Sequence, residues 1–175
     1  DHRDLHSFPT RRSSDLLYCQ LLRRTIARMK GEAPPLLVDV DLALDFLDIS
    51  PGSIDDARAA CLPYAYIEDE AHRLMVHRRI AEANSLLDVQ ALRRELADRY
   101  GQLPQAVQRL LKITEVRIFA AEKQIGRIET REGKIYLYRH QTRTPLFLHN
   151  RLPVLTGKTA EAKINALVRV LEQVL

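Results

Sequence analysis

The segment RRELADRYGQLP, residues 93–104, joins two predicted helices and decides how this part of the chain folds. Apolar side chains lead into it at helical spacing, at Val89, Leu92 and Leu96. Asp88 stands where this helix needs an N-cap. Gly101 ends the helix, and Pro104 falls at the first position of the next one, where a missing N–H is tolerated. The segment therefore predicts two helices joined by a short turn.

Three charged residues of this segment, Glu95, Asp98 and Arg99, are spaced i, i+3 and i+4. At about 100° per residue they share one face of the helix, beside the apolar stripe. One interpretation is a solvated surface with the ion pairs Glu95–Arg99 and Arg94–Asp98, each worth about 0.3 to 0.5 kcal/mol. The other interpretation is the rim of a protein interface. Spacing alone favours the solvated surface, so a functional role needs a further argument.

The rest of the chain predicts a small α+β domain. Hydrophobic periodicity predicts helices over 70–84, 104–125 and 160–174, a hairpin over 127–139 and another strand over 145–148. The hairpin turns at Glu132-Gly133, and Thr159 caps the last helix. The expected architecture is a single compact domain with helices flanking a small, mainly antiparallel sheet.

The N-terminal part divides into three predicted segments. Residues 1–16 lack periodicity and resemble the translation of a sequencing-library adapter, so we interpret them as a disordered artefact; a basic arm is the alternative. Residues 17–33 predict a connector helix that ends at Gly31. Residues 34–175 predict one domain, which opens with a strand over 36–42 and carries an insertion with a turn and a short helix over 50–60. A chain that begins in an adapter is expected to be a fragment.

Composition bounds the function classes. The 27 basic and 23 acidic residues are interspersed, so the net charge of +4 is weak support for nucleic-acid binding. No apolar run approaches the length of a membrane span, so no membrane partner is expected. Cys19 and Cys61 form neither a CxxC pair nor a disulfide framework, which indicates a reducing, cytoplasmic location.

Two patterns resemble metal sites. Asp39 and Asp41 would point to one face of the first strand, but without a third ligand a solvated face is the better interpretation. His72 and His77 lie five residues apart, which is not the i, i+4 spacing of a helical metal pair. No metal is predicted.

A third pattern resembles a nucleotide site. Gly157-Lys158-Thr159 ahead of a helix matches the end of a phosphate-binding P-loop. That motif requires a glycine five positions before Gly157, and Leu152 stands there. The sequence contains no other catalytic or cofactor motif that we recognise, so no catalytic residue and no cofactor are predicted.

Three groups of residues resemble one protein family. They are Leu62-Pro63-x-x-Tyr66-Ile67, then Arg73-Leu74 with Arg78-Arg79-Ile80-Ala81, then Glu95-Leu96-x-Asp98-Arg99-Tyr100-Gly101-x-Leu103-Pro104. Together they look like the C-terminal regulatory domain of bacterial transcription-repair coupling factors (Mfd). The resemblance extends from about residue 17 to near the C-terminus and is most specific between Leu62 and Ile125.

The resemblance implies a parent protein and partners. The parent would be an ATP-dependent DNA translocase of helicase superfamily 2 that removes stalled RNA polymerase and recruits nucleotide excision repair through UvrA. ATP and Mg would bind in its motor, outside this chain. The C-terminal domain would be regulatory rather than enzymatic, docking on a UvrB-like N-terminal module and masking UvrA binding. Carried over by position, Glu95, Asp98 and Arg99 would form the interdomain clasp.

Two alternatives stay open at this point. A small basic nucleic-acid-binding domain is favoured by the net charge and by Tyr136 and Tyr138, which lie between Lys134 and Arg139 as in a nucleic-acid-binding strand. Cross-strand packing on a covered sheet face explains these tyrosines equally well. A free-standing enzyme would need a catalytic constellation, which the sequence does not show.

Overall fold

Local sequence signals set the bounds of four helices and three strands in the computed structural model, which describes residues 39–50, 57–140, 142 and 144–174. The elements follow in the order β1 (Asp41–Leu44), α2 (Glu70–Glu82), α3 (Leu86–Tyr100), α4 (Gln105–Glu122), β2 (Ile125–Arg131), β3 (Lys134–Arg139) and α5 (Ala160–Glu172). The predictions for residues 1–38 lie outside the described residues.

Side-chain caps explain where the helices begin and end. Asp69 caps α2, as its carboxylate accepts a hydrogen bond from the His72 N–H at 2.7 Å. The predicted cap of α3 is wrong by three residues: Ser85 is the N-cap, and Asp88 completes a capping box by accepting from the Ser85 N–H at 3.0 Å. Gly101 ends α3 as expected, and Thr159 caps α5. Pro104 is the N-cap of α4 rather than its first residue.

The sheet is mixed, with strand order β1-β2-β3. The hairpin is confirmed: β2 and β3 are antiparallel and turn through Glu132 and Gly133, which have φ angles of 51° and 72°. β1 pairs in parallel with β2 and begins at Asp41, later than the predicted strand over 36–42. The strand predicted over 145–148 is wrong, because that segment meets β3 through one backbone hydrogen bond, from the Leu146 N–H to the Leu137 carbonyl at 2.8 Å.

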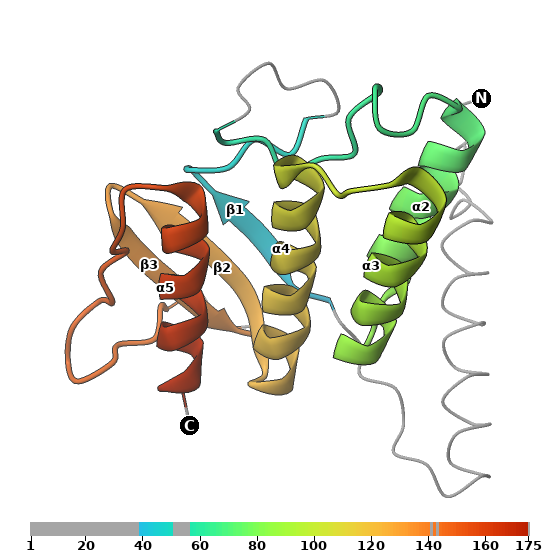
Figure 1. Cartoon of the computed structure of the whole chain (residues 1–175). Coiled ribbons are helices and arrows are strands. Elements are labelled where there is room, and N and C mark those ends of the chain that lie inside the picture. The colour runs from blue at the N-terminus through green and yellow to red at the C-terminus, as the bar shows by residue number, and fades with distance from the viewer. Residues whose placement is uncertain (1–38, 51–56, 141, 143, 175) are drawn as a thin grey trace, which may run out of the picture. The chain divides into compact units, whose positions relative to one another are not determined.

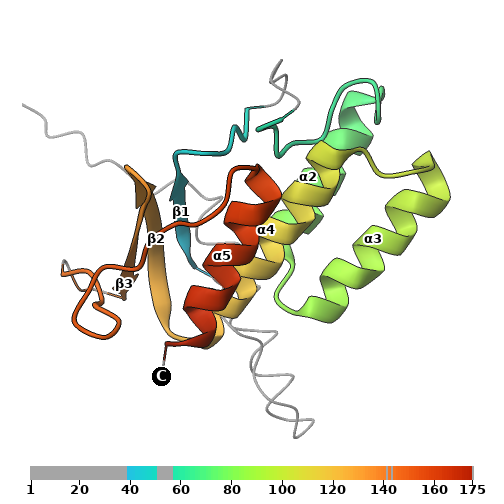
Figure 2. The same cartoon turned by 60° about the vertical axis from the view of Figure 1, so that its left-hand side comes forward.

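Helix α4 separates two hydrophobic clusters. One of its faces, including Val107 and Leu111, packs with α2 and α3. Another, including Val116 and Ala120, packs with the sheet and with α5. Figures 1 and 2 show α4 and α5 side by side over one face of the sheet, with the pair α2 and α3 beyond α4. We call the first cluster with its helices the helical half, and the second with its sheet the sheet half.

One buried arginine ties α4 and α5 to the segment before α2. The Arg109 side chain is 4% exposed. Its guanidinium donates hydrogen bonds to Glu161 Oε1 of α5 at 2.5 Å and to the Ala59 carbonyl at 2.9 Å. The short helix predicted within residues 50–60 is not present over 57–60, the part of that range after the gap in the described residues. The α+β class itself is confirmed.

Candidate functional site

Helices α2 and α3 lie antiparallel and meet through charged side chains. The Arg79 guanidinium of α2 binds both carboxylate oxygens of Glu95 on α3, at 2.5 and 2.7 Å. Neither of the ion pairs predicted from helical spacing, Glu95–Arg99 and Arg94–Asp98, forms in the described part of the chain. A bidentate guanidinium-carboxylate contact is a stronger arrangement than a pair along one helix, and it fixes the register between the helices.

A second contact between the side chains of α2 and α3 involves a histidine. Arg99 Nη2 lies 3.5 Å from His72 Nε2, about two turns from Arg79 toward the start of α2. His72 Nδ1 also lies 3.8 Å from the carboxylate of Asp69. The Arg99 guanidinium is 5.4 Å from the centre of the Tyr100 ring, which gives it a cation-π contact. His72 is therefore a neighbour of the predicted clasp and not a metal ligand.

Asp98 differs from the other two predicted residues. It is exposed, and no ion pair or hydrogen bond to its side chain is present among the residues that the structure describes. The structure therefore brings Glu95 and Arg99 against α2 and leaves Asp98 with its charge unmatched. This carboxylate is available to a partner without breaking any contact within the domain.

Exposed apolar side chains accompany these charges. In the described residues, five of the eight large apolar side chains that are exposed belong to α2, the start of α3 or the loop before α2, namely Tyr64, Leu74, Met75, Leu86 and Leu87. Leu74 is 70% exposed and Leu87 is 74% exposed. Such a concentration beside charged groups is typical of a protein interaction surface. We call Asp98 with Glu95, Arg99, Leu74 and Leu87 the docking face.

Interactions that the sequence did not reveal hold the docking face in place. The Tyr66 hydroxyl donates to the Leu96 carbonyl at 2.9 Å and is 3.2 Å from the Gly101 carbonyl. Tyr66 therefore ties the end of α3 to the loop before α2. Arg117 of α4 donates to the carbonyls of Ile80 and Ala81, both at 3.0 Å, at the end of α2. Burial lowers the pKa of Arg117. Tyr66 and Arg79 were present in the quoted motifs, but their partners could not be read from spacing.

The cations beside Glu95 favour the ionised form of its carboxyl group. Its hydrogen bonds with Arg79 lower the pKa of the Glu95 carboxyl, and the charges of Arg79 and Arg99 act in the same direction. The pKa of Arg79 is raised by the same hydrogen bonds. Because both side chains are more than a third exposed, solvent screens much of this interaction.

The remaining candidate sites have structural roles. Asp41 forms an ion pair with Arg127 at 3.6 Å, and the described residues contain no group of three or more side chains that could hold a metal ion. Burial lowers the pKa of His77, with a smaller effect from Arg73. In the segment that resembles a P-loop, Thr159 caps α5 by accepting from the Ala162 N–H at 3.2 Å, and Gly157 lies so close to Ala162 that a Cβ there would clash. Of the described helices, none combines the length and apolarity that a bilayer crossing requires.

Comparison with known proteins adds an independent observation. The TRCF domain family matches residues 57–146, which is more than half of the chain and includes α2, α3, α4 and the hairpin. The chain belongs to the TRCF domain family. The match contains the whole segment between Leu62 and Ile125, where the sequence resemblance is most specific.

Individual relatives of this TRCF domain agree with the family match. Transcription-repair-coupling factors of Haemophilus influenzae and Myxococcus xanthus are 34% and 29% identical over 113 residues, 65% of this chain and 9% and 8% of theirs. That of Escherichia coli is 29% identical over 116 residues, 66% of this chain and 10% of its own. The matched stretch is therefore about a tenth of these relatives. A crystal structure of the C-terminal domain of transcription-repair coupling factor has the same fold, with a TM-score of 0.60 and 19% identity over 78% of this chain and 91% of that one.

Proposed function

We propose that this TRCF domain is the regulatory C-terminal domain of a transcription-repair coupling factor. Its parent is an ATP-dependent DNA translocase that removes stalled RNA polymerase and recruits nucleotide excision repair in the cytoplasm. The domain docks on the UvrB-like module of the same protein and masks UvrA binding. ATP and Mg belong to the motor of the parent, and no catalytic role is proposed for the chain itself.

The observation that carries this proposal is the docking face. Asp98 offers a carboxylate without a partner in the described part of the domain, and Leu74 and Leu87 present apolar surface on the same pair of helices. These side chains belong to the segment that the family match covers. A carboxylate without a described partner and exposed apolar groups on the same two helices suit a protein partner that supplies a cation and an apolar contact.

The geometry also supports a reversible contact. Close charge pairs at a protein interface couple by about 1.5 to 7 kcal/mol, and their strength depends on salt and geometry. Glu95 is held in place by Arg79 before docking, so it needs little further ordering. The domain can inhibit UvrA binding only by the amount that docking favours the closed state, so a partner that favours the open state releases it.

Asp98 gives a cleaner test than Glu95. Reversing Glu95 to Lys would place a third cation beside Arg79 and Arg99 and weaken the helix pair itself. Asp98→Lys changes a side chain with no partner among the described residues, so the fold is expected to persist. We expect Asp98→Lys to weaken binding to the UvrB-like module by about tenfold or more, as measured by titration calorimetry with the complete chain.

A matched control separates docking from general charge effects. Glu172→Lys makes the same change of charge at an exposed position at the end of α5, remote from α2 and α3 in the chain. It is expected to leave affinity for the module unchanged. Equal binding by the wild type and by Asp98→Lys would contradict the clasp, and equal weakening by both variants would show that only net charge matters.

A further inference from the structure

The sheet has one face that no described helix covers. Figure 2 shows α4 and α5 on one side of the three strands and no described helix on the other. Strand register places two rows of side chains on that open face: Asp41, Arg127 and Tyr138 in the first, and Ala43, Glu129 and Tyr136 in the second. The rows between them, which include Ile128 and Leu137, face the core. The described helices therefore leave the face that carries Tyr136 and Tyr138 open (Figure 2).

Tyr136 and Tyr138 of β3 are both half-buried. Because they are two residues apart on one strand, both rings stand on the open face. The Arg131 guanidinium of β2 lies 5.7 Å from the centre of the Tyr136 ring. The rings therefore share this face with a cation, Arg131, which also lies near the carboxylates of Glu129 and Glu132.

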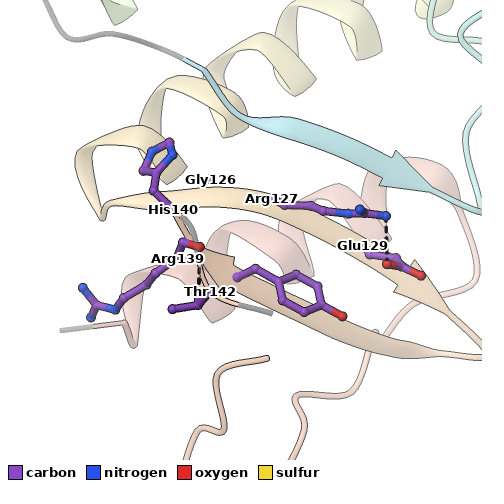
Figure 3. A pocket seen from close by; sticks show the side chains of 7 residues that line it. Gly126, Arg127, Glu129, Arg139, His140 and Thr142 are labelled. Atoms are coloured by element: carbon purple, nitrogen blue, oxygen red, sulfur yellow. Dashed lines mark hydrogen bonds and ion pairs between the residues drawn. The ribbon is translucent and has the colours of Figure 1, made fainter. Parts of the chain in front are cut away.

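A pocket of about 380 Å³ lies beside Tyr138 at the end of the hairpin. Figure 3 shows the lining residues: Arg127 and Glu129 on the sheet, the His140 ring near Gly126, and Thr142 beside Arg139, whose side chain points away from the others. A Cβ on Gly126 would lie 2.7 Å from His140 Nδ1, so glycine allows the ring to pack on the strand. The volume falls in the range of small-ligand sites.

Some charged groups on this face have ion-pair partners and others have none among the described residues. Arg127 is held between Asp41 at 3.6 Å and Glu129 at 3.2 Å, so both carboxylates are already matched. Arg131 contacts the Tyr136 ring, and Lys134 is exposed with no ion-pair partner among the described residues. Attraction for an anion is therefore expected mainly from Arg131 and Lys134. These two residues flank the Glu132-Gly133 turn, at the opposite end of the hairpin from the pocket.

We propose that this open face binds single-stranded nucleic acid. Bases stack on Tyr136 and Tyr138, phosphates lie toward Arg131 and Lys134, and the pocket beside Tyr138 receives one further base between the tyrosine and His140. Aromatic rings on an open sheet face, here half-buried, with cations at one end suit single-strand binding, because stacking is tolerant of sequence and phosphates need cations. A duplex keeps its bases stacked inside and cannot use the rings.

Binding can be tested with the complete chain and labelled oligothymidylate or oligouridylate of about 12 nucleotides. We expect fluorescence anisotropy to show binding at low salt that weakens steeply as salt rises. The logarithm of the binding constant should fall with the logarithm of the salt concentration by a slope of about 0.7 for each phosphate contacted. A blunt duplex of the same length is expected to bind at least about fivefold more weakly, since it cannot stack on the rings. The DNA and RNA probes distinguish the two sources of a single strand through the 2′-hydroxyl.

Variants of the tyrosines decide whether stacking is involved. Tyr136→Leu and Tyr138→Leu keep apolar bulk but remove the ring, and each is expected to weaken single-strand binding by about fivefold or more. Tyr136→Phe and Tyr138→Phe keep the ring and are expected to retain binding, and circular dichroism of the leucine variants checks that they are folded. Tyr64→Leu is the matched control, because Tyr64 is exposed and has the Arg73 guanidinium 4.4 Å from its ring centre, but belongs to the loop before α2.

Three results would overturn the proposal. They are no binding of either single strand at low salt, equal affinity for the duplex, and equal binding by the leucine and phenylalanine variants. Asp98→Lys is expected to bind the oligonucleotides as the wild type does, so this face and the docking face fail or succeed separately.

Discussion

Helix α2 in the helical half and helix α5 in the sheet half have the same length but bury their apolar residues differently. In α5 the apolar stripe at Ile164, Leu167 and Leu171 is fully buried. In α2 only Val76 and Ile80 are buried, while Leu74 and Met75 face outward. An apolar residue that is out of phase with the core of its own domain gives no stability to that domain. The comparison supports the proposed docking face on α2 and gives no such support for α5.

Charged groups join elements in both halves. In the helical half, Arg79 of α2 binds Glu95 of α3. In the sheet half, Arg127 of β2 contacts Asp41 on β1 as well as Glu129 on its own strand. The difference is that the ionic contacts of the sheet lie on the face that no described helix covers (Figure 2).

The largest effect is expected from opening a cavity in the core of either half, at Leu111 of α4 or at Leu137 of β3. Leu111 is fully buried in the helical half, and Leu137 is its counterpart in the sheet half. Leu111→Ala and Leu137→Ala should each lower the free energy of unfolding by about 3 to 5 kcal/mol. Urea unfolding followed by circular dichroism should show one transition in both variants. Two separate transitions in either variant would mean that the halves fold independently.

A smaller effect is expected from Arg109, which links the halves at one end. Arg109→Met removes the hydrogen bonds to Glu161 and to the Ala59 carbonyl, and leaves that carbonyl without its charged donor. We expect a loss of about 2 to 4 kcal/mol in the free energy of unfolding. Glu161→Gln keeps an acceptor near Arg109 and should cost less than half as much in the same urea titration. A cost equal to that of Arg109→Met would assign the effect to the ion pair alone.

Gly101 in the helical half and Gly133 in the sheet half allow the turns of the two halves to be compared. Gly101 has φ 83° and ψ −160°, a region that only glycine adopts readily, and Gly133 has φ 72° in the hairpin. A Cβ would meet no atom within 4 Å at either position, so substitution tests the backbone alone. Gly101→Ala is expected to cost about 1 to 3 kcal/mol and Gly133→Ala about 1 kcal/mol, measured as shifts of the thermal midpoint. The reverse order would contradict the described backbone at residue 101.

The smallest effect concerns the Arg79–Glu95 pair and depends on pH. The folded pKa of Glu95 lies below its ordinary value, so its contribution is complete at neutral pH and is lost as the pH falls through the folded pKa. A double-mutant cycle with Arg79→Gln and Glu95→Gln should give a coupling of about 0.2 to 1 kcal/mol at pH 7, because both groups are partly exposed. The coupling should decline as the pH is lowered through the folded pKa of Glu95. A coupling that survives acid would mean that packing, not charge, joins the helices.

Much of the fold was predictable because its signals are local. The Glu132-Gly133 turn, Gly101 and Thr159 mark their elements through backbone geometry that only a few residues satisfy. The cap of α3 was misplaced because Ser85 and Asp88 both accept hydrogen bonds at that turn, and the sequence does not show which is the cap. The strand expected over 145–148 failed because this apolar segment only borders the sheet, where it makes one backbone hydrogen bond to β3.

The candidate site was less predictable because its contacts are long-range. The spacing of Glu95, Asp98 and Arg99 was legible, but the partner of Glu95 is Arg79, sixteen residues earlier on another helix. Which side chain is left unmatched, here Asp98, depends on that pairing. For the same reason the open face of the sheet could not be read from Tyr136 and Tyr138, since alternation gives two faces and does not say which one the helices cover.

The parallel pairing of β1 with β2 has a consequence for synthesis. Asp41 pairs with Arg127, so a strand of four residues finds its partner only after all of α2, α3 and α4 have been made. At about 5 to 20 residues per second, β1 leaves the ribosome several seconds before β2 exists. During that interval its backbone has no sheet to join, so β1 is expected to be the last strand to enter the sheet and the hairpin the first part of the sheet to assemble.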